Sequence, residues 1–356
     1  MTYQLQGNYG AILQNYALQT FLKSIGHTPV TIQWETAFNS WKDYLRGIYY
    51  LLKNWNKTEY HVSPTLPGHF RLHKENGGRR KFVKRNIRLS KTCLIDNLMK
   101  LMHSEKYDAL IVGSDQVWRP SFIENISIMF FSFAQGLDVR RIAYAASFGV
   151  SYNDFSPEQL QECRTLLENF DCVSVREDSA IDQCRKLFGY QNVSWMPDPT
   201  FLIPKSYYEN CCHDNVQRNN VLFAYILDND NEKLAYINKF ASQHNLEAII
   251  RYEGGVPTDT VEDWLALFRD AEYVVTDSFH GTVFSLIFHR NFTLFKNQYR
   301  GNIRLESLSR QMGIYEYCVE DTQSYSTYFP DWNQIELTIQ KWRKIGADFL
   351  ISNLKK

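Results

Sequence analysis

The chain has 356 residues, more than one compact core usually carries, so we expect two domains. Lysine plus arginine and aspartate plus glutamate each number 39, which gives a formal net charge of zero at pH 7. This balance argues against a nucleic-acid-binding protein, because such proteins carry a strong basic field. An anionic ligand must therefore be held by a local group of charges.

The seven cysteines are odd in number and show no C-x-x-C spacing, which favours reduced thiols in the cytoplasm. The N-terminus lacks a basic region followed by an apolar stretch, and no run of about 18 apolar residues occurs. We therefore expect a cytoplasmic protein. We find no spacing of metal ligands and predict neither a metal nor a cofactor.

Residues 1–205 alternate strand-like and amphipathic helix-like segments, a pattern that predicts a parallel sheet covered by helices. We expect strands at 1–5, 28–34, 109–112, 141–146 and 172–175. We expect helices at 11–24, 94–104 and 157–169, and a further helix after residue 176 that ends at about residue 188. These segments form the predicted N-terminal Rossmann-like domain.

Residues 36–90 interrupt this alternation and are interpreted as an insertion into the first domain. An aromatic helical stripe at 38–55 is followed at 71–88 by eight basic residues against the single acidic residue Glu75. One interpretation is core packing for the rings and solvation for the charges. The other is contact with an anionic membrane surface or a lipid diphosphate, which would place the protein at the inner face of the cell membrane.

The polar segment 210–220 reads as a linker, and the alternation resumes after it. Strands are expected at 221–226, 247–251, 273–275 and 292–295, with helices at 231–244, 261–271 and 281–289. The last 25 residues predict one amphipathic helix. The predicted domains are therefore 1–205, a second Rossmann-like domain at 206–330, and a C-terminal helix at 331–356.

Polar residues and glycines gather directly after the predicted strands, at 7–10, 113–115, 147–149, 176 and 276–281. In open α/β sheets the ligand crevice lies outside the carboxyl ends of the strands, so these groups are expected to share one site. The TDSFHG sequence at 276–281 has three capping residues before an apolar helix, so first-turn N–H groups would face the crevice. His280 could bind an anion or transfer a proton there. Alternatively, Ser278 only caps the helix and His280 is a turn residue.

Arg176 follows a predicted strand and could make bidentate bonds to a carboxylate or phosphate, or it could pair with Glu177 or Asp178. Asp115 could act as a base or bind a hydroxyl group, or it could be a carboxylate that bonds its own turn. The basic residues near the second-domain site form either a ligand set or a solvated face; they are Lys296, Arg300 and Arg304.

Six sequence motifs together resemble those of the polysaccharide pyruvyl transferase family. They occur in family order and cover most of the chain: NYGAILQ at 8–14 followed by YALQ at 16–19, GSDQVW at 113–118, AYAASFG at 143–149, SVRE at 174–177, DPT at 198–200 and VTDSFHGT at 275–282.

The resemblance implies two Rossmann-like domains arranged as in glycosyltransferases of the B type (GT-B), with the C-terminal helix crossing back to domain 1. It also implies transfer of pyruvate from phosphoenolpyruvate, as a ketal, to a sugar of a polysaccharide precursor such as a capsule or exopolysaccharide. The family's donor-binding arginine and its histidine match Arg176 and His280. Together with the reading of the residues, we predict His280 and Asp115 as the catalytic residues. The predicted donor-binding residues are Arg176, Ser278, Phe279, His280, Gly281, Lys296 and Arg304. The predicted acceptor-binding residues are Asn8, Tyr9, Ser147 and Asp115.

Two departures from the family pattern concern the donor and the start. Relatives carry an arginine two residues before the histidine, where this chain has Ser278. Relatives also have a full strand before the NYG loop, whereas here only Met1 to Gln6 precede Gly7 and that loop. Two other functions stay open: a GT-B glycosyltransferase that uses a nucleotide sugar, and a non-catalytic sugar-binding relative. The acceptor sugar, its linkage to a lipid diphosphate and the oligomeric state are not readable from the residues.

Overall fold

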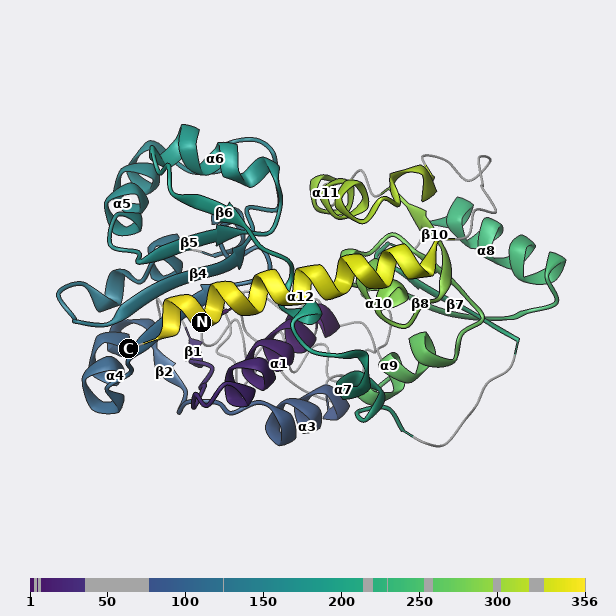
Figure 1. The fold of residues 1–356 in the computed structure, drawn as a ribbon, viewed down its shortest axis with the longest axis horizontal. Coiled ribbons are helices and arrows are strands. Elements are labelled where there is room, and N and C mark those ends of the chain that lie inside the picture. Colours follow the sequence, from purple (N-terminus) through teal and green to yellow (C-terminus); the bar gives the residue numbers. More distant parts are fainter. Residues whose placement is uncertain are drawn as a thin grey trace, which may run out of the picture.

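The computed structural model describes residues 1–2, 5, 8–35, 77–123, 125–213, 220–228, 230–252, 259–296, 302–319 and 330–355. The predicted aromatic helix at 38–55, the basic residues at 71–76, most of the linker and Arg300 lie outside them. The described part of the chain forms two parallel sheets, each with helices packed around it (Figure 1). No described helix combines the length and the apolar character needed to cross a membrane.

The first sheet has four parallel strands in the order β3-β4-β5-β6. Its strands are β3 (Ala109–Gly113), β4 (Arg140–Ala146), β5 (Cys172–Val175) and β6 (Val193–Trp195). The helices of this half are α1 (Tyr9–Ser24), α3 (Gly77–Asn86), α4 (Leu98–Glu105), α5 (Pro157–Leu167) and α6 (Ser179–Phe188). A separate parallel pair joins β1 (Trp34–Glu35) to β2 (Cys93–Leu94).

The second sheet has five parallel strands in the order β11-β10-β9-β7-β8. They are β7 (Val221–Ile226), β8 (Glu247–Tyr252), β9 (Tyr273–Thr276), β10 (Asn291–Phe295) and β11 (Cys318–Val319). The helices after residue 205 are α7 (Lys205–Glu209), α8 (Asn231–Gln243), α9 (Val261–Asp270), α10 (Phe279–Ile287) and α11 (Ile303–Met312). β7 is buried at every position, which agrees with its uninterrupted apolar sequence.

The C-terminal helix α12 (Trp332–Leu354) runs across both halves (Figure 1). Near its start, Glu336 pairs with His289 at the end of α10, with 3.1 Å between Oε2 and Nε2. Near its other end, the carbonyl oxygen of Asn353 accepts a hydrogen bond from the Arg140 guanidinium of β4. The predicted fold class is therefore confirmed, including the helix that returns to the first half.

Capping residues and one shared core explain why these elements form where they do. Ser156 and Gln159 make a capping box at the start of α5, as the Ser-Pro start predicted. A single apolar cluster joins Leu13 of α1, Trp264 of α9 and Trp342 of α12. The two halves are therefore packed through α1 and α12.

Some predicted elements differ from the structure. The expected strand at 28–34 is wrong as a continuous strand, because only an isolated bridge at Thr31 and the two residues of β1 pair. The expected helix at 94–104 begins later, at Leu98, after β2 and a short 3₁₀ turn. Of the expected strand at 1–5, Met1 pairs with β3 through its backbone, while residues 3–4 lie outside the described part.

Candidate functional site

Polar residues follow the carboxyl end of each strand of the first sheet. Asp115 comes after β3, Ser147 after β4, Arg176 after β5 and Asp198 after β6. In the second sheet β9 is followed by α10, whose second residue is His280. Contacts among these residues bring the ends of both sheets to one place, as the positions of the polar clusters predicted.

Arg176 is buried at the centre of this place, with a side chain only 2% exposed. Its Nη1 donates to Asp198 Oδ2 at 2.9 Å and to Ser114 Oγ at 3.3 Å, and its Nε donates to Glu177 Oε1 at 3.2 Å. Its Nη2 lies 3.9 Å from Asp115 Oδ1, too far for a hydrogen bond. Burial alone would lower the pKa of Arg176, but these three carboxylates raise it above its ordinary value.

Asp198 is fully buried, and both of its oxygens are occupied. Oδ1 accepts from the backbone N–H and the hydroxyl of Thr200, while Oδ2 accepts from Arg176 Nη1 and Ser114 Oγ. Oδ2 also lies 3.7 Å from His280 Nε2, across from the second half. Burial would raise the pKa of Asp198, but His280 and Arg176 outweigh it and hold the pKa well below its usual range.

His280 reaches this carboxylate from the first turn of α10. The helix begins there because Ser278 Oγ accepts from the backbone N–H of Gly281. The other side of the imidazole packs on Gly10 of α1, where a Cβ atom would come within 1.9 Å of His280 Nδ1. Gly10 is thus required for the close approach of a side chain from the other half of the molecule.

Two buried side-chain nitrogens are left open at this site. Within the described part of the chain, neither Arg176 Nη2 nor His280 Nε2 has a hydrogen-bond partner. Both side chains lie beside the same carboxylate, because Arg176 Nη1 and His280 Nε2 lie 2.9 Å and 3.7 Å from Asp198 Oδ2. Leaving a buried donor unpaired costs about 1–3 kcal/mol, more for charged groups, so an anion placed here would be stabilised.

The other predicted donor-binding residues differ in how closely they approach Arg176. The ring of Phe279 packs under the guanidinium of Arg176, with 4.4 Å from Cζ to the ring centroid. Arg304, from α11, is close enough to feel the charges of Arg176 and Asp115, and burial followed by the charge of Arg176 lowers the pKa of Arg304 to about 10. Lys296 lies over the ring of Tyr315, 5.5 Å from its centroid.

On the predicted acceptor side, Asn8 is exposed and caps α1 through its side-chain oxygen. Asp115 is partly exposed next to Arg176, in a backbone conformation with a φ of 69°. Ser147 is fully buried and donates to Glu177 Oε1 at 2.8 Å. Asn8 and Asp115 can therefore be reached from outside, whereas the hydroxyl of Ser147 serves the internal network.

Tyr9 is directed away from this network. Its ring stacks on Trp264, with 5.0 Å between centroids, and the guanidinium of Arg79 covers the ring at 4.1 Å. Its hydroxyl donates to the carbonyl oxygen of Asp259 and accepts from Arg79. Tyr9 thus packs α1 against α9. Arg79 and Arg85, which pairs with Glu262, show that two residues of the basic stretch make internal contacts.

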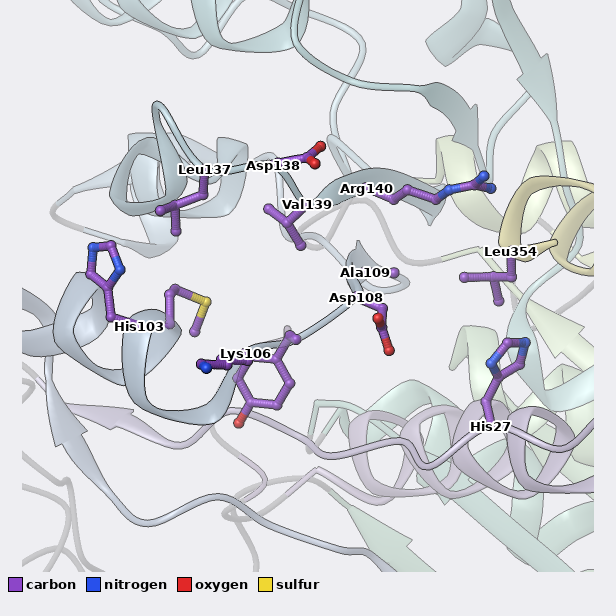
Figure 2. Close-up of a pocket in the computed structure, with 12 residues that line it drawn as sticks. His27, His103, Lys106, Asp108, Ala109, Leu137, Asp138, Val139, Arg140 and Leu354 are labelled. Carbon is purple, nitrogen blue, oxygen red and sulfur yellow. The ribbon is translucent and has the colours of Figure 1, made fainter. Parts of the chain in front are cut away.

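Two cavities lined by described residues lie away from this group. One of about 550 Å³ is at the amino ends of β3 and β4, between His27 and Leu354 on one side and His103 and Lys106 on the other (Figure 2). Another, of about 330 Å³, lies between α7 and α12. Neither is lined by a predicted site residue. The described residues hold no group of three His, Cys, Asp or Glu side chains that could bind a metal.

Two residues of the site escaped the sequence-based list. Asp198 was noticed only as part of the DPT motif, although its place after a strand and before Pro199 was a usable signal. Gly10 was expected in a loop, and its contact with His280 joins segments that are 270 positions apart, so no local pattern could reveal it. Of the two acidic partners that the sequence offered for Arg176, Glu177 does pair with it. Asp178 pairs with Arg310 instead.

Comparison with solved structures finds proteins of low sequence identity. A UDP-N-acetylglucosamine 2-epimerase from Rickettsia bellii is 12% identical, with a TM-score of 0.44 over 98% of this chain and 97% of that chain. A UDP-GlcNAc 2-epimerase from Neisseria meningitidis, bound to UDP-GlcNAc, is 10% identical, with a TM-score of 0.46 over the same shares. The ADP-heptose LPS heptosyltransferase II of E. coli is 9% identical, with a TM-score of 0.36 over 94% of this chain and 97% of that chain.

A search of curated protein sequences returns no match. The family model described as polysaccharide pyruvyl transferase, by contrast, matches residues 8–299. The match begins at Asn8, two positions before Gly10, and includes Arg176, Asp198 and His280. It covers most of the chain and agrees with the six motifs, so the chain belongs to the polysaccharide pyruvyl transferase family.

Proposed function

We propose that this chain transfers pyruvate from phosphoenolpyruvate to two hydroxyl groups of a sugar in a polysaccharide precursor, as a ketal, and releases phosphate. The observation that carries the proposal is the pair of buried, unpartnered donors, Arg176 Nη2 and His280 Nε2. Phosphoenolpyruvate brings two anionic groups, a carboxylate and a phosphate. A buried arginine next to a helix N-terminus offers a separate partner for each.

The first turn of α10 provides the second anion-binding element. Ser278 Oγ already satisfies the N–H of Gly281. The backbone N–H groups of Phe279 and His280, at the two preceding positions, have no partner within the helix and carry its positive dipole end. One anionic group of the donor would bind these amides and the other would bind Arg176 Nη2.

Ketal formation makes specific demands on the site. The bond between C2 and the phosphate oxygen breaks, C2 gains bonds to two acceptor oxygens, and the methylene carbon gains one proton. Two hydroxyl protons are released, so one replaces the proton delivered to carbon and the other leaves with phosphate. His280 is our candidate acid for the methylene carbon, and Asp115, partly exposed beside Arg176, would orient or deprotonate an acceptor hydroxyl.

The decisive experiment offers the purified protein both donor classes with a panel of free and lipid-diphosphate-linked saccharides. We expect acceptor-dependent release of phosphate from phosphoenolpyruvate and, by mass spectrometry, an acid-labile pyruvate ketal on the sugar. His280→Gln should abolish the product, whereas His213→Gln, at an exposed histidine far from the site, should not. Consumption of a nucleotide sugar without consumption of phosphoenolpyruvate would refute the proposal.

A further inference from the structure

Asp198 is a buried carboxylate that the proposed reaction leaves without a role. It joins the two halves at the site: it accepts from Arg176 after β5 of the first sheet and faces His280, which follows β9 of the second. Every polar contact of its Oδ2 atom is with a residue of this site or its immediate support, Ser114. Its carboxylate therefore lies next to both side chains that carry the open donor atoms.

The local chain fixes this carboxylate in one orientation. Pro199 begins a 3₁₀ turn, and Asp198 caps it by accepting from Thr200 through Oδ1. The carbonyl oxygen of Thr200 in turn accepts from the hydroxyl of Tyr208. Because Oδ1 is held by two hydrogen bonds from Thr200, Oδ2 is directed toward Arg176 and His280, and rotation of the carboxylate would break both of these bonds.

The carboxylate of Asp198 faces His280 as well as Arg176. Arg176 shares Oδ2, but its own charge is also matched by Glu177 at Nε and by Asp115 near Nη2. Asp198 is the one charged group among the described residues that the structure places within ion-pair distance of His280. Two opposite charges 3.7 Å apart attract more strongly in this buried site than in water.

We infer that Asp198 is a positioning residue that keeps His280 protonated on both ring nitrogens and holds its Nε2–H toward the carboxylate oxygen that Arg176 also contacts. The inference rests on the proposed function, in which His280 gives a proton to the donor. Arg304, the other cation near the group, interacts electrostatically with Arg176, Asp115 and Glu177. Asp198 itself does not touch the donor; it acts through His280.

The first test needs no substrate and no change at Asp198. Protein labelled with ¹⁵N-histidine contains nine histidines, and the signal of His280 is the one that disappears in His280→Gln. In the wild-type protein near pH 7 we expect the two ring nitrogens of His280 to show the shifts of a doubly protonated imidazolium. Shifts of a neutral tautomer would overturn the inference, whatever the protein does with phosphoenolpyruvate.

The second test compares Asp198→Asn with Tyr208→Phe, which removes a hydrogen bond to the same turn without altering Oδ2. In Asp198→Asn we expect His280 to become neutral near pH 7 and kcat to fall by about tenfold or more, with a smaller rise in the donor KM. In Tyr208→Phe we expect His280 to stay protonated and kcat to change by less than about twofold. Equal losses of kcat in two folded variants would show that Asp198 is only structural. A wild type that ignores phosphoenolpyruvate would refute the proposed function and leave the NMR result to decide the inference.

Discussion

Gly10→Ala should inactivate the enzyme while leaving it folded. The added Cβ would lie 1.9 Å from His280 Nδ1 and 2.4 Å from Cγ and Cε1 of the same ring, whereas ordinary contacts are about 3.5–4.0 Å. The imidazole must therefore move by about 1.5 Å. A misplacement of about 1 Å can cost on the order of 10²-fold in rate, equivalent to about 2.7 kcal/mol of activation free energy. Alanine in the first turn of α1 regains up to about 1 kcal/mol over glycine, against about 1–3 kcal/mol for the overpacking, so the net loss of stability is smaller.

Gly346→Ala is the matched control for this change. Gly346 is also a helical glycine, in α12, where a Cβ would lie 2.4 Å from Tyr144 Oη and 2.8 Å from Leu202 Cδ2. We expect a loss of stability comparable to that in Gly10→Ala, with kcat near wild type. The assays are phosphate release from phosphoenolpyruvate and thermal unfolding. A folded Gly10→Ala protein with wild-type kcat would show that the close packing of His280 on Gly10 is not needed for turnover.

Three other outcomes follow from the charges of the structure. Arg176→Lys keeps a positive charge but loses the fork, so we expect the donor KM to rise by about tenfold or more in steady-state assays; an unchanged KM would move the anion site elsewhere. Asp198 has a lowered pKa, so its contribution to stability is present above about pH 5 and is lost as the pH falls toward its folded pKa. In urea unfolding from pH 6 to 3, the free energy of unfolding should therefore fall more steeply in wild type than in Asp198→Asn. Parallel curves for the two proteins would contradict this. The pair between Glu336 and His289 is about one-third exposed, so Glu336→Gln should lower the free energy of unfolding by less than about 1 kcal/mol; a loss above about 2 kcal/mol would mean that this pair anchors α12.

Elements that are marked by a short, continuous pattern of apolar or capping residues could be predicted from the sequence. The strand at 221–226 and the Ser-Pro start of α5 are examples, because apolar runs and capping residues act locally. The strand expected at 28–34 failed for the opposite reason. Its apolar residues pack against other elements, but only Thr31 and the short β1 find partners, and pairing depends on strands distant in sequence.

The candidate site shows the same division. Arg176 and His280 could be selected from the sequence, because each follows a strand and carries a recognisable chemistry. The direction of the Tyr9 side chain could not, since it is set by Trp264 and Arg79, both far along the chain. Asp198 was visible as a motif, but its importance comes from the closeness of His280, which belongs to the other sheet.

The serine at position 278 bears on how positive charge would reach the proposed donor. The family resemblance implies an arginine at this position, whereas Ser278 is buried and its hydroxyl caps α10. Arg304 approaches the same group of charges from α11, where burial and then the charge of Arg176 lower its pKa to about 10. If the proposed donor binds here, its negative charge would oppose the repulsion between Arg304 and Arg176. Arg304 of the next helix would then supply positive charge that the family resemblance places at the first turn of α10.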